Sequence, residues 1–130
     1  MSYASRTPGE HKTSESNKSV EGNCSWALWL LWRLDEHWEM SGAYDHPDFM
    51  MAPSAYFRRQ CYLAVECDEE PAEVVTRYGL EERIVFSTDY PHADSKYPKA
   101  VDRFLRLPLS EETKRKFLWD NCARLYHLAG

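Results

Sequence analysis

The chain has 130 residues, of which 43% are hydrophobic and 28% are charged, a composition typical of one globular domain with a sizeable core. The net charge of −5 at pH 7 argues against a nucleic-acid-binding protein, because such proteins usually carry a basic patch or stripe. No apolar run approaches the roughly 18 residues that a transmembrane helix needs, and the polar N-terminus lacks an apolar signal region, so we expect a cytoplasmic protein that does not contact a membrane.

The first predicted boundary lies between residues 19 and 20. Residues 1–19 are rich in serine and contain no Val, Ile, Leu, Phe or Trp, so this polar segment cannot bury enough apolar surface to offset its ordering entropy. We therefore predict a disordered tail over 1–19 and a folded domain over 20–130.

The next segment, SWALWLLWRLDEHWEM (25–40), predicts a helix with Ser25 as its N-cap. The first half of this helix is apolar on all sides, which predicts deep packing. Its tryptophans are expected in the core and at interfaces rather than against a substrate.

The remaining pattern alternates helices and strands. We expect strands at 61–67 and 83–87, because both are short and nearly uninterruptedly apolar. Helices are expected at 53–60 with Pro53 in the first turn, at 70–79 with Gly79 as the stop, at 97–107, and at 110–128 with Ser110 as the cap.

This order predicts an α/β fold in which the two strands are adjacent and parallel. Two strands cannot hide the edges of their own sheet, so the pattern is typical of a slice of a larger domain. We therefore expect self-association through the exposed edges and the tryptophan-rich helix.

Asp89 is the most conspicuous candidate for chemistry. It lies two residues beyond the end of the strand at 83–87, where α/β folds place their sites. A carboxylate there can bind a metal or act as a general base. The alternative is that Asp89 only forms the turn before Pro91. A local metal site of Asp89, His92 and Asp94 is disfavoured, because closed sites normally need three or four convergent ligands.

Several stretches resemble the amidohydrolase-related family of metal-dependent hydrolases and decarboxylases. They are PSAYFRRQCYLAVECDEEP (53–71), FSTDYPHAD (86–94) and LSEETKRKFLWDNCARLYHL (109–128), while WLLWRLDEHWE (29–39) resembles the segment after the sixth barrel strand. The most specific pattern is a strand followed by Ser-x-Asp-Tyr-Pro-His and, later, Asn-x-Ala-x-Leu-Tyr. The resemblance covers about residues 20–130.

The resemblance implies a partial (β/α)8 TIM barrel, with the C-terminal β/α units of about strands 7 and 8 and their flanking helices. In that family a divalent metal, expected to be zinc, is held by a His-x-His, a further His and a strand-8 Asp, which Asp89 matches. This sequence has no His-x-His among its five histidines. We therefore expect this chain alone to bind no metal. Glu21 lies where many relatives carry a catalytic His, so its role stays open.

Two further residues are candidate substrate-binding groups. His92 either lines the substrate pocket or donates to Asp89, or it is a solvated loop residue. Arg33 either binds a substrate carboxylate or pairs on the surface with His37 or a nearby acid.

Two functions follow from the resemblance. In the first, the chain contributes Asp89 to a hydrolase or decarboxylase that acts on a small molecule. In the second, it is a truncated, non-catalytic remnant that self-associates or binds other chains.

Overall fold

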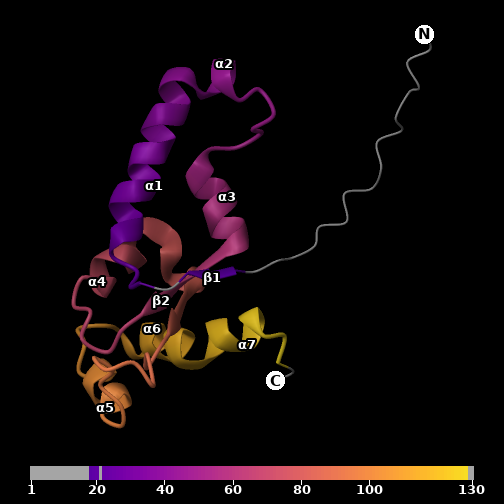
Figure 1. Ribbon diagram of the computed structural model, residues 1–130. Coiled ribbons are helices and arrows are strands. Elements are labelled where there is room, and N and C mark those ends of the chain that lie inside the picture. The colour runs from indigo at the N-terminus through magenta and orange to yellow at the C-terminus, as the bar shows by residue number, and fades with distance from the viewer. Residues whose placement is uncertain (1–17, 21, 129–130) are drawn as a thin grey trace.

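Three short parallel strands form the centre of the protein (Figure 1). The computed structural model describes residues 18–20 and 22–128. The strands β1 (Lys18–Val20), β2 (Cys61–Val65) and β3 (Ile84–Phe86) follow one another across the sheet, and both neighbouring pairs are parallel. The predicted adjacency of the second and third strands is confirmed.

The first strand was not among the elements predicted from the residue pattern. It includes Lys18 and Ser19, which the sequence had assigned to the polar tail, and it pairs with the beginning of β2. The rest of the predicted tail, residues 1–17, lies outside the described residues.

Helical segments connect the strands and follow the last one. Between β1 and β2 lie α1 (Trp26–His37), the π-helical turn η1 (Trp38–Gly42), α2 (Ala43–Asp45) and α3 (Pro53–Gln60). Between β2 and β3 lie α4 (Ala72–Val75), the π-helical turn η2 (Thr76–Leu80) and the 3-10 turn η3 (Glu81–Arg83). After β3 come α5 (Ala100–Phe104), α6 (Glu111–Arg115), the π-helical turn η4 (Lys116–Asp120) and α7 (Asn121–Leu125). The α/β class is thus confirmed. None of the helices in these ranges is long and apolar enough to cross a membrane.

Three of the four predicted helix-end residues behave as expected. Pro53 begins α3, and Gly79 has a φ of 75°, a left-handed conformation that ends the helical segment before β3. The Ser110 hydroxyl accepts a hydrogen bond of 3.1 Å from the Thr113 N–H. The prediction that the Ser25 side chain caps the helix is wrong. Its hydroxyl forms no hydrogen bond with the helix and instead donates one to Glu69 at 2.6 Å.

Glu69 takes over the capping of α1 from a different part of the chain. Its Oε1 accepts hydrogen bonds from the N–H groups of Cys24 (2.9 Å) and Ser25 (2.8 Å), while Oε2 accepts one from the Glu66 N–H at 3.3 Å. Glu69 is only 6% exposed. A buried carboxylate at a helix N-terminus satisfies otherwise unpaired N–H groups and interacts favourably with the helix dipole. This contact joins the start of α1 to the end of β2.

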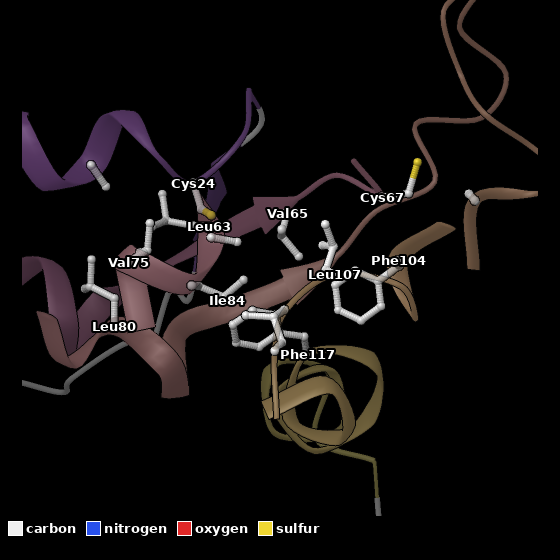
Figure 2. Packing of buried hydrophobic residues seen from close by; sticks show 14 of the residues in the cluster. Cys24, Leu63, Val65, Cys67, Val75, Leu80, Ile84, Phe104, Leu107 and Phe117 are labelled. Carbon is white, nitrogen blue, oxygen red and sulfur yellow. The ribbon is translucent and has the colours of Figure 1, made fainter. Parts of the chain in front are cut away.

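The two faces of the sheet carry different clusters. Successive side chains of a strand alternate between faces, so Leu63, Val65 and Ile84 point to the main core. There they pack with side chains from the surrounding helices, including Phe104 and Phe117 (Figure 2). The other face carries a smaller cluster, whose members are Tyr62, Val85 and Leu125, with Cys122 against them.

The last helical stretch is tied to the entrance of β3 by polar contacts. Asn121 is fully buried, and its Nδ2 donates to the carbonyl groups of Glu81 (2.8 Å) and Ile84 (2.7 Å). Lys116 forms ion pairs of 2.8 Å with both Glu81 and Glu82. Together these contacts hold the helices that follow β3 against the strand that precedes the candidate site.

The packing of α1 differs from the prediction of deep burial. Its inner side, with Ala27 and Leu31, is buried, and Trp26 packs edge-on against Phe57 with ring centroids 6.4 Å apart. Trp29 and Trp32, however, are 65% and 56% exposed. In Figure 1, α1 and α3 form an arm that projects from the sheet, and Trp29 and Trp32 border a broad hollow between α1, α3 and the α4–η2 segment.

We expect Glu69→Gln to destabilise the protein. The neutral amide keeps the shape of the side chain but loses the negative charge that accepts hydrogen bonds from three N–H groups and a hydroxyl. The free energy of unfolding should fall by about 1–3 kcal/mol, the range for disrupting buried hydrogen bonds to a charged group. Urea denaturation measures this quantity. Glu70→Gln at the exposed neighbouring position is the matched control, and equal stability of both variants would contradict the role of Glu69.

Candidate functional site

The carboxyl ends of the three strands meet at a small hollow. Its volume is about 40 Å³, and it is lined by Ala64 of β2 and by residues that follow the strands, namely Gly22, Asn23, Glu66, Ser87 and Asp89. Parallel strands place all their carboxyl ends at one edge of a sheet, which is where α/β folds bind ligands. Ala64 lies in β2 and Glu66 directly after it, Ser87 directly follows β3, and Asp89 lies in the turn beyond, and all four line the same hollow.

Asp89 forms a tight turn as well as lining the hollow. Its φ is 57°, a left-handed conformation that Asp tolerates better than most residues. Its N–H donates to the Ser87 hydroxyl at 3.2 Å, and its carbonyl accepts from the His92 N–H at 2.9 Å. The turn therefore exists, and it directs a carboxylate that is 35% exposed into the site.

His92 lies directly beside Asp89. Its Nδ1 is 2.9 Å from Asp89 Oδ1, while the imidazole is 65% exposed. The contact restricts the orientation of the Asp89 carboxylate. Of the alternatives open for His92, the structure shows the contact with Asp89, made by a side chain that is also largely in solvent.

Glu66 is a site residue that sequence reasoning missed. Burial raises the pKa of its carboxyl above the usual range, and the negative charge of Asp89 raises it further, followed by smaller effects of Asp68, Glu69 and Asp94. Its signal was present in the sequence, because Glu66 lies near the end of the predicted strand at 61–67, as Ser87 lies at the end of the predicted strand at 83–87. Applying the strand-end argument to both strands would have found it.

Two other predicted positions are not brought to this hollow. Arg33 is exposed on the second half of α1, the part of the helix that runs away from the sheet toward α2 (Figure 1). It forms no ion pair within residues 18–20 and 22–128, so the expected pairing with a nearby acid is absent there. Glu21 lies outside the described residues.

The residues at the hollow do not by themselves fit a metal ion. An aspartate oxygen is a suitable ligand for zinc or manganese, but stable sites combine three or more protein ligands. In the described part of the chain, no group of three or more His, Cys, Asp or Glu side chains could hold a metal. Asp89 can therefore be one ligand of a metal site but not the whole of it.

Comparison with protein-family models shows to which family the chain belongs. The sequence profile of the amidohydrolase family matches residues 16–128. The chain belongs to the amidohydrolase family. This match spans all three strands, the helices between them and the hollow at their carboxyl ends.

Solved structures of this kind resemble the chain over most of its length. It is 26% identical to 5-carboxyvanillate decarboxylase LigW from Sphingomonas paucimobilis, with a TM-score of 0.62 over 79% of this chain and 31% of that one. For an amidohydrolase of Mycobacterium avium subsp. paratuberculosis K-10, the identity is 22% and the TM-score 0.66, over 84% of this chain and 27% of that one. A dihydroxybenzoic acid decarboxylase of Polaromonas sp. JS666 was solved with bound manganese and the inhibitor 2-nitroresorcinol. Its sequence identity to this chain is 22% and the TM-score is 0.63, over 86% of this chain and 34% of that one.

The chain thus spans between 27% and 34% of the length of these three proteins. At 22% identity the last two support the shared fold alone. No curated protein matches the sequence.

We expect the purified chain to hold no stoichiometric zinc or manganese at micromolar protein concentration, because one carboxylate cannot offset the loss of the ion's hydration shell. Elemental analysis after gel filtration measures the metal content. About one tightly held ion per chain, lost in an Asp89→Asn variant and kept in Asp94→Asn, would contradict this reading of the site.

Proposed function

We propose that the chain forms the C-terminal β/α units of an amidohydrolase-type (β/α)8 barrel. In this assignment β2 and β3 are strands 7 and 8, and β1 is the end of strand 6. The parallel order of the strands and the helical segments between them support it. In the closed barrel the face with Ala64 and Val85 would be the interior, which in this chain is the face that packs against Leu125.

The proposed role of the chain is to supply the strand-8 carboxylate, Asp89, to the active site of a metal-dependent hydrolase or decarboxylase of small molecules. The observation that carries this proposal is the position of Asp89 at the carboxyl end of β3, facing the same hollow as Glu66. Active sites of (β/α)8 enzymes lie at this end of the barrel. A divalent metal bound there, with ligands from outside the described residues, would supply Lewis-acid activation of the substrate.

The neighbouring side chains have distinct proposed parts. His92 would orient the Asp89 carboxylate through its 2.9 Å contact and line the entrance of the substrate pocket. Glu66 would act as a proton donor or acceptor, since a carboxyl whose pKa lies above its usual range is nearer the pH of most reactions. The position of Arg33 on the arm favours a contact with another chain over one with a substrate at Asp89.

The similarity to 5-carboxyvanillate decarboxylase favours decarboxylation of an aromatic acid over hydrolysis of a C–N or C–O bond. The alternative function, a non-catalytic chain that binds other chains, is favoured by one observation. Within residues 18–20 and 22–128, the side chains do not complete a metal site.

The two functions separate in a reconstituted barrel. The part of 5-carboxyvanillate decarboxylase that precedes its matched segment would be fused ahead of Lys18, and carbon dioxide release from aromatic acids would be measured with added manganese. We expect Asp89→Asn to lower turnover about 10²-fold or more, the scale for losing an acid–base or ligand carboxylate. His92→Ala should have a smaller effect, mainly on KM.

Asp94→Asn is the control, because Asp94 is an exposed carboxylate of the same loop. Full activity of the reconstituted barrel with Asp89→Asn would contradict the proposed role of Asp89. A chimaera that sediments as one compact species, binds manganese and releases no carbon dioxide from any aromatic acid would favour the non-catalytic alternative.

A further inference from the structure

A broad hollow lies between α1, α3 and the α4–η2 segment, beside the arm shown in Figure 1. Its volume is about 500 Å³, which is within the range of sites that bind small molecules. None of its lining residues also lines the smaller hollow at Asp89. We call it the α1–α3 hollow, and the residues that line it include Trp29, Trp32, Asp35, Arg58, Val74 and Tyr78.

The walls of the α1–α3 hollow are largely apolar and aromatic. Trp29 and Trp32 lie three residues apart on one side of α1, while Tyr78 of η2 and Val74 of α4 contribute further apolar surface. All four side chains are exposed to solvent. Such walls gain most from a partner that is itself aromatic, because offset and edge-to-face ring pairs add to the gain from burying apolar area. The walls therefore favour an aromatic ligand.

Arg58 is the cationic residue among those that line the hollow. Its Nη1 donates to the Ser54 hydroxyl at 2.8 Å, and its Nη2 donates to the Tyr78 carbonyl at 3.2 Å. Both acceptors are neutral, and within residues 18–20 and 22–128 Arg58 forms no ion pair with a carboxylate. A guanidinium group has five N–H donors, so these two bonds fix its position and leave further donors for a ligand.

Asp35, the other charged residue of the hollow, is engaged by the start of α3. Its Oδ1 accepts a hydrogen bond of 2.9 Å from the Ser54 N–H, in the first turn of that helix. A carboxylate at a helix N-terminus satisfies an otherwise unpaired N–H group and interacts favourably with the helix dipole. The negative charge of Asp35 therefore serves α3, whereas the positive charge of Arg58 has no carboxylate partner in the described chain.

We propose that the α1–α3 hollow binds an aromatic acid. The ring of the ligand packs against Trp29, Trp32 and Tyr78, and its carboxylate or sulfonate accepts hydrogen bonds from the Arg58 guanidinium. The planar fork of N–H groups on arginine matches such an anion, and a charge-assisted hydrogen bond is stronger than one between neutral groups. The proposal does not depend on the function assigned to Asp89, because the two hollows share no lining residue.

Fluorescence titration of the full chain with two dyes tests the proposal. The first, 8-anilinonaphthalene-1-sulfonate, is an aromatic anion, and the second, N-phenyl-1-naphthylamine, has the same rings without the sulfonate. We expect the anion to bind one saturable site with a dissociation constant on the order of ten micromolar, an affinity typical of ligands of this size. Arg58→Gln should weaken binding of the anion about tenfold, the scale for losing a hydrogen bond to a charged group, and leave binding of the neutral dye unchanged.

Two further variants locate the site. Arg59→Gln is the matched control, because this neighbouring arginine lies over the Tyr56 ring and does not line the hollow, so anion binding should not change. Val74→Glu places a carboxylate at an exposed position in the hollow and should weaken anion binding about tenfold or more.

Three results would overturn the proposal. Anion binding that does not saturate, or that Val74→Glu leaves unchanged, would mean that the dye binds elsewhere. An equal loss of both dyes in Arg58→Gln would mean that Arg58 only holds the walls together through Ser54 and Tyr78. We expect 1-naphthoate to displace the anionic dye at lower concentration than decanoate does, and equal displacement by the alkyl acid would contradict an aromatic ligand.

Discussion

The carboxylate of Glu69 is the contact on which the arrangement of this protein depends. It accepts hydrogen bonds from the N–H groups of Cys24 and Ser25, just before α1, and from the N–H of Glu66, just after β2. One buried side chain thereby fixes the segment after β1 relative to the segment after β2. Gly22 and Asn23 immediately precede the capped residues, and they line the hollow opposite Glu66. The geometry of the site therefore follows from the way in which α1 is capped.

A second group of contacts fixes the third strand. Asn121 and Lys116 hold the last helical stretch against η3 and the start of β3. The pairing of β3 with β2 then positions the carboxyl end of β3 beside that of β2. The Asp89 side chain lines the hollow because the backbone of Asp89 adopts a left-handed conformation just beyond β3. The backbone at the carboxyl edge of the sheet thus positions the residues of the site.

Local sequence signals predicted much of this fold, and they failed where distant contacts decide. The apolar runs at β2 and β3, Pro53, Gly79 and Ser110 act through neighbouring residues, so pattern and propensity suffice for them. The capping of α1 comes from a residue 44 positions away from Ser25, which no local rule reveals. Strand β1 is three residues long and gains its pairing from β2, and the exposure of Trp29 and Trp32 follows from the projection of the arm. Asp89 was found through its place after a strand, whereas Glu66 was overlooked although the same argument applied.

The central claim is that the carboxyl ends of β2 and β3 bring Glu66 and Asp89 into one hollow. The titration of the Glu66 carboxyl carbon by NMR, in the native protein and in Asp89→Asn, tests it most directly. The account predicts a pKa for Glu66 above the usual glutamate range, which falls in Asp89→Asn because the neighbouring charge is gone while the burial remains. Asp102→Asn, an exposed carboxylate on α5, should leave that pKa unchanged. A Glu66 pKa that is the same in all three proteins would contradict the shared hollow and the site built on it.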